Sequence, residues 1–162
     1  MPSFDLVAGE GLRAHFESEE ARLLRELLAE MNILLEADVP RIDPVKQRLL
    51  PDAYDDPDAA ENYRGLTEDD LMQAKREALR AVRQRLGERG GLDASIPEEE
   101  VSSWLAVLTD LRLAIGVRLD VDEAKMETEL DPDDPDAPAM SVLHWLGWVQ
   151  GTMLGALGWE GP

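Results

Sequence analysis

The sequence contains no cysteine. Without a thiol, the chain has no disulfide, thiolate nucleophile, cysteine-ligated zinc or thiol-based redox switch of its own. Histidine is also scarce, with 2 residues in the chain, so a histidine-based metal site would be poorly supplied. No Ser-His-Asp arrangement or phosphate-binding loop is visible either. We therefore expect no cofactor, no metal and no enzymatic activity.

Basic residues are few compared with acidic ones. The chain has 16 Lys and Arg against 35 Asp and Glu, and its formal net charge is −19. Such a charge repels phosphate groups and anionic lipid headgroups. Basic residues do gather between Lys75 and Arg89, but Glu77 and Glu88 interrupt them. We expect no direct binding to nucleic acid.

Signals for export or membrane insertion are weak. The first residues show no basic segment followed by an apolar run, so we expect a cytoplasmic protein. Residues 139–159 carry no formal charge, and 21 residues could cross a bilayer. However, Ser141, His144, Gln150 and several glycines interrupt the segment, and no Lys or Arg flanks it. These features favour a buried helix and no membrane association.

The first part of the chain predicts a hairpin followed by a helix. Residues 3–16 contain two short runs on either side of Gly9 and Gly11, and glycine readily supplies the positive φ of a tight turn. Ser18 is placed as an N-cap before leucines that recur at spacings of three and four. This pattern predicts an amphipathic helix over residues 19–36.

Prolines and capping boxes predict the next helices. The Asp-Pro pairs at 43–44 and 56–57 each predict a short helix, because proline is favoured in the first helical turn. A capping-box pattern at 67–70 predicts the start of another helix, which ends near Gly87. Its expected apolar stripe consists of Leu71, Ala74, Ala78, Val82 and Leu86.

The second half predicts two more helices. A capping-box pattern at 95–98 precedes a helix over about 97–119, and residues 120–138 form an acidic, proline-rich loop by composition. A last helix is expected over about 139–157. We predict a single domain over residues 1–162, mainly α, with a helical bundle around the helix at 97–119 and an N-terminal β-hairpin.

The helix at 97–119 contains the stretch SSWLAVLTDLRLAIGVRL, which is apolar but carries charges. At 100° per residue, Arg112 falls within the apolar stripe that includes Trp104, whereas Asp110 points about 160° away. Because a buried unpaired charge costs several kcal/mol, each needs a partner outside the helix. Asp110, Arg112 and Arg118 are therefore structural tethers or, alternatively, contacts for a protein partner.

Glycines recur in the last helix at Gly147, Gly151 and Gly155. Each costs about 1 kcal/mol relative to alanine inside a helix, so we expect another element to pack against this flat face. An internal helix is favoured over a second copy in a homodimer, because an almost uncharged helix requires cover on all sides. The face could alternatively form a groove for a small molecule.

Several sequence blocks resemble one protein family. The stretch WLAVLTDLRLAIGVRL is similar to the central motif of the actinobacterial AosR-type transcriptional regulators, formerly described as a domain of unknown function. The blocks RLLPDAYDD, YRGLTEDDL and LHWLGWVQGTML resemble further parts of that family in the same order. The resemblance covers nearly the whole chain.

This resemblance implies a regulator of the oxidative-stress response that works with a sigma factor and RNA polymerase. The redox sensing proposed in the family uses a pair of cysteines, so that switch cannot be carried over to this chain. We expect a cytoplasmic regulatory protein that acts by protein–protein contact. The alternatives are a small-molecule sensor and, third, an enzyme whose fold gathers Asp52, Asp69 and Asp110 in one cleft.

Overall fold

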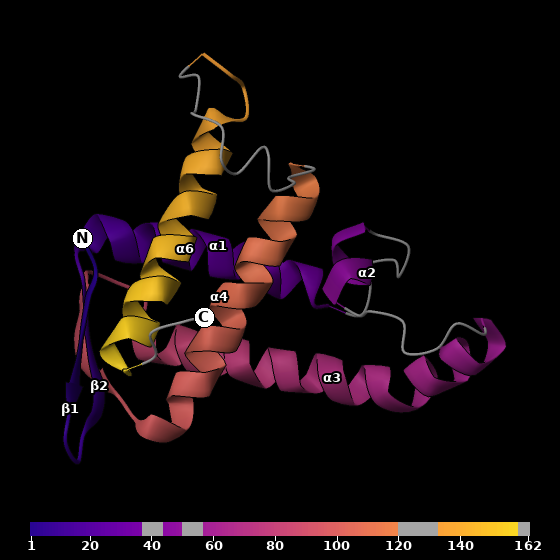
Figure 1. Ribbon diagram of the computed structural model, residues 1–162, viewed down its shortest axis with the longest axis horizontal. Coiled ribbons are helices and arrows are strands. Elements are labelled where there is room, and N and C mark those ends of the chain that lie inside the picture. Colours follow the sequence, from indigo (N-terminus) through magenta and orange to yellow (C-terminus); the bar gives the residue numbers. More distant parts are fainter. Residues whose placement is uncertain (37–43, 50–56, 120–132, 159–162) are drawn as a thin grey trace.

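The computed structural model describes residues 1–36, 44–49, 57–119 and 133–158, without the side chains of residues 46–48 and 57–69. It confirms the mainly α-helical fold (Figure 1). The elements, in chain order, are β1 (Ser3–Val7), β2 (Gly11–Phe16), α1 (Ser18–Leu34), α2 (Pro44–Leu49), α3 (Pro57–Leu86), β3 (Leu92–Ile96), α4 (Glu98–Arg118) and α6 (Ala137–Ala156).

The N-terminal hairpin is confirmed. Strands β1 and β2 are antiparallel; the turn between them contains Gly9 at φ 81°, and β2 begins with Gly11 at φ 94°. These values lie in the left-handed region, where glycine has no steric penalty. Alternate residues of β2 are buried, namely Leu12, Ala14 and Phe16. One face of the hairpin therefore contributes to the core.

A third strand extends this sheet and was not predicted. Strand β3 pairs antiparallel with β2, so Ala14 lies opposite Ala94 and Phe16 opposite Leu92. Ser95 belongs to β3, and the N-cap of α4 is Pro97. The predicted capping box at 95–98 is therefore wrong, because pairing with a distant strand outweighs a local capping preference.

The first long helix begins one residue earlier than predicted. Its N-cap is Glu17 rather than Ser18, and the backbone N–H of Glu17 donates to the Glu20 carboxylate at 2.9 Å. This contact satisfies a backbone donor that the helix itself leaves unpaired. The position of the helix is otherwise as expected.

Helix α3 differs more from the prediction. It runs for 30 residues without a break, so the helix start at Pro57 is confirmed, whereas the short length of that helix and the separate start at 67 are wrong. Once a helix has formed, each added residue gains a hydrogen bond at little cost, so an internal capping-box pattern need not interrupt it. The stripe was also misplaced, because Leu71 and Ala74 are exposed. The buried positions are Met72, Leu79, Val82 and Leu86.

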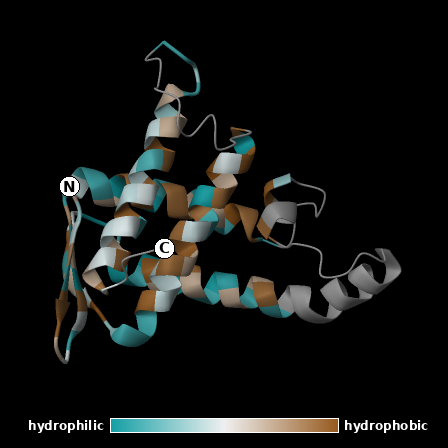
Figure 2. Cartoon of the chain, in the orientation of Figure 1, coloured by the Kyte–Doolittle hydropathy of each residue, from teal (hydrophilic) through white to brown (hydrophobic). Residues whose placement is uncertain are grey.

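Helix α4 occupies the centre of the helical part. It contacts α1, α2, α3, α6 and β2. Figure 1 shows α4 and α6 running antiparallel beside each other and crossing α1, while α3 runs antiparallel to α1. In Figure 2 the first turn of α4 is hydrophilic, because Glu98, Glu99 and Glu100 lie there. The prediction of a bundle around the helix at 97–119 is confirmed.

The core is organised around Trp104, which is 1% exposed. Its ring centroid lies 6.2 Å from that of Phe16, and Phe16 in turn makes an edge contact with Phe4 at 5.7 Å. Aromatic pairs at these separations stabilise beyond the area they bury. Trp104 therefore joins the sheet to the central helix.

The last helix begins within the predicted loop. Helix α6 starts at Ala137 and has Pro138 in its first turn, where proline is well tolerated. The predicted loop therefore extends too far at its C-terminal end, and residues 120–132 lie outside the described residues. None of the described helices combines the length and apolar character that crossing a bilayer requires.

We expect Gly91→Ala to destabilise the fold through the sheet. A Cβ atom at Gly91 would lie 2.3 Å from the carbonyl oxygen of Phe16, so the backbone would have to shift at a cost of about 2 kcal/mol. Urea unfolding followed by circular dichroism measures this change. Gly116→Ala is the control, because no neighbouring group among the described residues lies within 4 Å of its added Cβ. Equal stability of both variants would contradict the expectation.

Candidate functional site

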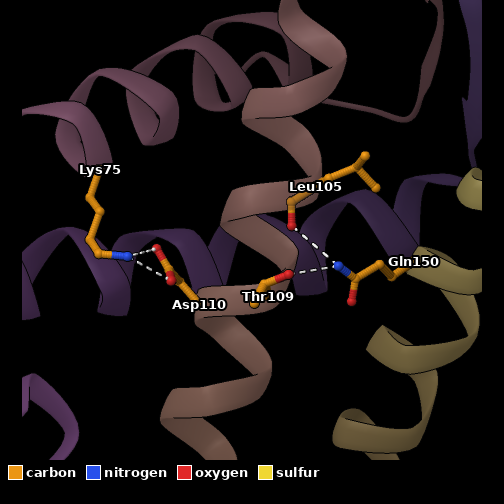
Figure 3. Close-up of polar contacts among 5 residues, drawn as sticks. All are labelled: Lys75, Leu105, Thr109, Asp110 and Gln150. Carbon is orange, nitrogen blue, oxygen red and sulfur yellow. Dashed lines mark hydrogen bonds and ion pairs between the residues drawn. The ribbon is translucent and has the colours of Figure 1, made fainter. Parts of the chain in front are cut away.

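Asp110 is paired through a buried contact with α3. It is 8% exposed, and the Nζ atom of Lys75 lies 2.9 Å and 3.0 Å from its two carboxylate oxygens (Figure 3). The pair also lies deep in the side-chain packing, with 16% and 12% of the Lys75 and Asp110 side chains exposed. Lys75 thus supplies the partner that Asp110 requires.

Arg112 is paired separately, with α6. Its Nη1 donates to the side-chain oxygen of Gln150 at 2.9 Å. The amide nitrogen of Gln150 donates to the hydroxyl of Thr109 at 2.7 Å and to the carbonyl oxygen of Leu105 at 3.3 Å. A single side chain from α6 therefore contacts three residues of α4. Figure 3 shows Gln150 and Asp110 on opposite sides of α4.

The burial of the two charged residues differs from the sequence interpretation. Asp110 is buried and Arg112 is half-buried, although Arg112 was placed on the apolar side. Ser102, Ala106 and Thr109 of α4 are exposed. Neighbouring helices bury the side of α4 near Asp110, which periodicity within α4 cannot show.

The glycine face of α6 is covered only at one end. An added Cβ at Gly147 would lie 3.6 Å from the guanidinium of Arg112, whereas nothing in the described residues lies within 4 Å at Gly151 or Gly155. The expected internal helix therefore does not cover Gly151 and Gly155 in the described part of the chain. The homodimer alternative stays a prediction.

Trp104 and Arg118 have different environments. The indole nitrogen of Trp104 is buried and has no hydrogen-bond partner among the described residues, so Trp104 acts through packing. Arg118 lies 3.8 Å from Glu30, and both side chains are more than half exposed. Exposed pairs of this kind contribute less than about 1 kcal/mol. Of the predicted charged candidates, Arg118 is the one available at the surface.

A second ion pair joins α3 to α4 and was missed in the sequence. Arg85 donates twice to Glu100, at 3.1 Å and 2.8 Å, and these hydrogen bonds raise the pKa of Arg85 above its ordinary value. The resulting stabilisation is present below the unfolded-state pKa of Arg85 and is lost only as pH rises through the higher folded-state value. Both lie far above neutral pH, so this pair is constant under physiological conditions.

Lys75 could have been found from the sequence. It lies between Met72 and Leu79, at a spacing of three and four residues, in what proves to be the buried stripe of α3. A lysine within an apolar stripe needs a carboxylate partner. The predicted apolar stripe runs through Leu71 and Ala74 instead, so it does not include Lys75. Gln150 carried no comparable signal.

The Asp110 carboxylate is engaged by Lys75. No group of three or more His, Asp or Glu residues in the described part of the chain could hold a metal ion. The side chains of Asp52 and Asp69, the other members of the proposed carboxylate cleft, lie outside the described residues. The contacts of Asp110 with Lys75 and of Arg112 with Gln150 hold α3, α4 and α6 in a defined register.

Comparison with known proteins now places the chain. Residues 1–157 match a family model described as a domain of unknown function, DUF2017. The chain belongs to this family. Its match covers nearly all of the sequence, which includes the hairpin, α4 and α6. No solved structure gives a significant match to the chain.

Relatives of the chain have functional names. The oxidative stress regulators AosR of Mycobacterium tuberculosis and Mycobacterium bovis are 34% identical to it over 122 residues, which is 67% of this chain and 55% of the relative. The putative oxidative stress regulator AosR of Mycobacterium leprae is 32% identical over 129 residues, or 71% and 58%. The resemblance to AosR is confirmed, and the chain spans little more than half the length of these relatives.

We expect Asp110→Ala to lower the free energy of unfolding by about 3 kcal/mol, because it leaves the Lys75 ammonium group without its buried partner. The double variant Lys75→Met, Asp110→Leu removes both charges and should be much closer to the parent in stability. Urea unfolding of the parent, the single variants and the double variant measures the coupling. A double variant as unstable as Asp110→Ala would contradict the inference that the unpaired Lys75 charge causes the loss of stability.

We expect Gly151→Ala and Gly155→Ala each to stabilise the protein by about 0.5–1 kcal/mol, because alanine favours the helix and both sites have open space. Thermal unfolding and sedimentation velocity at several protein concentrations test this. If copies of the chain pack on this face, the variants should instead lower the dimer fraction and the thermal midpoint.

Proposed function

We propose that this chain is a regulatory protein that acts in transcription by binding a protein partner, with a sigma factor or RNA polymerase as the expected partner. The observation that carries the proposal is the identity of 34% to AosR, named an oxidative stress regulator, over 67% of the chain. Proteins of one family can share binding partners, and this supports the transfer of a regulatory role from AosR to this chain. We also propose a cytoplasmic location, where such partners are found.

The chemistry of the chain supports binding over catalysis. The buried polar groups of α4 contact Lys75 and Gln150 within the protein, so they are engaged in holding helices together. The net charge of −19 favours association with a basic protein surface, since complementary charge accelerates and orients encounter. The first turn of α4 offers the exposed Glu98 and Glu99 for such contact, whereas Glu100 is paired with Arg85.

The absence of cysteine gives the proposal a specific form. A chain without a thiol cannot respond to oxidants through its own disulfide chemistry. We propose that its partner binding does not depend on the redox state of the chain. The alternative is a ligand groove beside Gly147. This alternative gains no support, because the Arg112 guanidinium lies over this glycine.

Capture experiments with the purified, tagged full chain test the proposal. We expect binding to a purified sigma factor or to RNA polymerase, weakening as salt rises because exposed charges are screened. Treatment of the chain with a disulfide-forming oxidant should leave binding unchanged. The variant Glu98→Lys, Glu99→Lys should bind more weakly, whereas the charge-matched control Glu19→Lys, Glu26→Lys on α1 should not.

Two results would count against the proposal. The first is that the chain binds neither a purified sigma factor of its organism nor the polymerase core at low salt. This result would exclude the expected partners. Tight binding to duplex DNA at physiological salt, in the absence of these proteins, would show direct nucleic-acid recognition instead.

A further inference from the structure

A basic hollow lies between α1 and α3, in a chain that is otherwise strongly acidic. Its volume is about 680 Å³, within the range of roughly 300–1,000 Å³ typical of small-molecule sites. The basic side chains that line it are Arg25, Arg76, Arg80 and Arg83. We call these four residues the arginine cluster.

The arginine cluster reverses the local sign of charge. Four of the 16 basic residues of the chain line this hollow, and Glu88 is the one carboxylate among its lining residues. Arg76, Arg80 and Arg83 recur along one face of α3 at spacings of four and three, so their positive charges repel one another. A bound anion would relieve this repulsion.

Two members of the cluster are held in place by backbone carbonyl groups. Arg25 donates to the carbonyl oxygens of Leu86, Gly87 and Gly90 at 3.3, 2.9 and 2.6 Å. The Nε of Arg76 donates to the carbonyl oxygen of Leu35 at 3.0 Å. These acceptors orient both guanidinium groups without neutralising their full charge.

The other two members are available. Arg80 and Arg83 are exposed, and neither of their side chains forms a hydrogen bond or ion pair with the described part of the chain. Arginine presents a planar set of donors that fits phosphate oxygens in pairs. The hollow therefore combines two fixed and two free guanidinium groups.

The remaining lining adds neutral groups. Leu28 and Leu86 border the hollow but are closed to solvent, with 0% and 2% of their surface exposed. Asn32 and Gln84 supply neutral amide groups. The surface that a ligand meets is therefore cationic and polar, which suits a small molecule with several negative charges.

We propose that the arginine cluster between α1 and α3 binds a small molecule with several linked phosphate groups. Arg80 and Arg83 contact its phosphate groups, and Arg25 and Arg76 supply fixed positive charge. This site is separate from the first turn of α4 and does not depend on the proposed protein partner. In a chain without cysteine, it provides a route by which a metabolite can act on the protein.

Calorimetric titration of the purified full chain tests the site, with ATP, inorganic tripolyphosphate and adenosine as probes in magnesium-free buffer. We expect ATP and tripolyphosphate both to bind, because each presents three linked phosphate groups to the guanidinium groups. Adenosine, which has no phosphate, should not bind detectably. Binding should weaken with added salt.

Matched variants separate the site from general charge. Arg80→Ala, Arg83→Ala should weaken ATP binding by about tenfold or more, since each removes a charge-assisted hydrogen bond. Arg22→Ala, Arg118→Ala removes the same charge from exposed arginines elsewhere and should change affinity less than about twofold. Arg80→Lys, Arg83→Lys keeps the charge and should show intermediate affinity.

Three outcomes would overturn the proposal. The first is that neither ATP nor tripolyphosphate binds at concentrations up to about 1 mM, a limit that corresponds to weak binding. Both alanine pairs could weaken binding equally, which would indicate general charge attraction. Finally, an acidic peptide or single-stranded DNA could bind to the arginine cluster while ATP does not, which would assign the surface to a macromolecule. Circular dichroism of each variant confirms that it is folded.

Discussion

The arrangement of the helices depends on the neutralisation of Asp110 within the central helix. A carboxylate that is 8% exposed would be strongly unfavourable without a cation. Lys75 provides that cation from α3. A second pair, Arg85 with Glu100, lies ten residues further along α3 and ten residues earlier along α4. The two pairs therefore define how α3 lies against α4. Sliding one helix past the other would separate both pairs at once.

Helix α6 is held against α4 by different chemistry. Gln150 has a donor group and an acceptor, so it can satisfy Thr109, Leu105 and Arg112 together. Gly147 allows the Arg112 guanidinium to approach α6. Because these groups are engaged within the protein, the proposed partner contact falls to exposed side chains such as Glu98 and Glu99. The arginine cluster lies elsewhere, between α1 and α3.

Local features were predicted well from the sequence. The hairpin, α1, α2 and the central helix follow from glycine turns, helical spacing and an Asp-Pro pair, all of which act over a few residues. Strand β3 was missed because its stability comes from β2, and Arg13 and Asp93 in these strands are separated by 80 positions. The extent of α3 was missed because local capping patterns do not report whether a helix continues through them.

The candidate site shows the same division between local and distant information. Periodicity indicated that Asp110 and Arg112 point in different directions and need different partners, because a helix has a fixed rotation per residue. Periodicity within α4 could not identify the partners, since the signal for Lys75 lies in the buried stripe of α3 and Gln150 carries no comparable signal.

The sequence by itself determined the helical class, the central position of the charged helix and the exclusion of thiol chemistry. Each of these follows from composition or from spacing within one segment. Only the tertiary structure decided which side chains meet, how far α6 is covered and where four arginines converge. Such contacts depend on the distances between helices in space, and these distances are set by packing of the whole core rather than by any single segment.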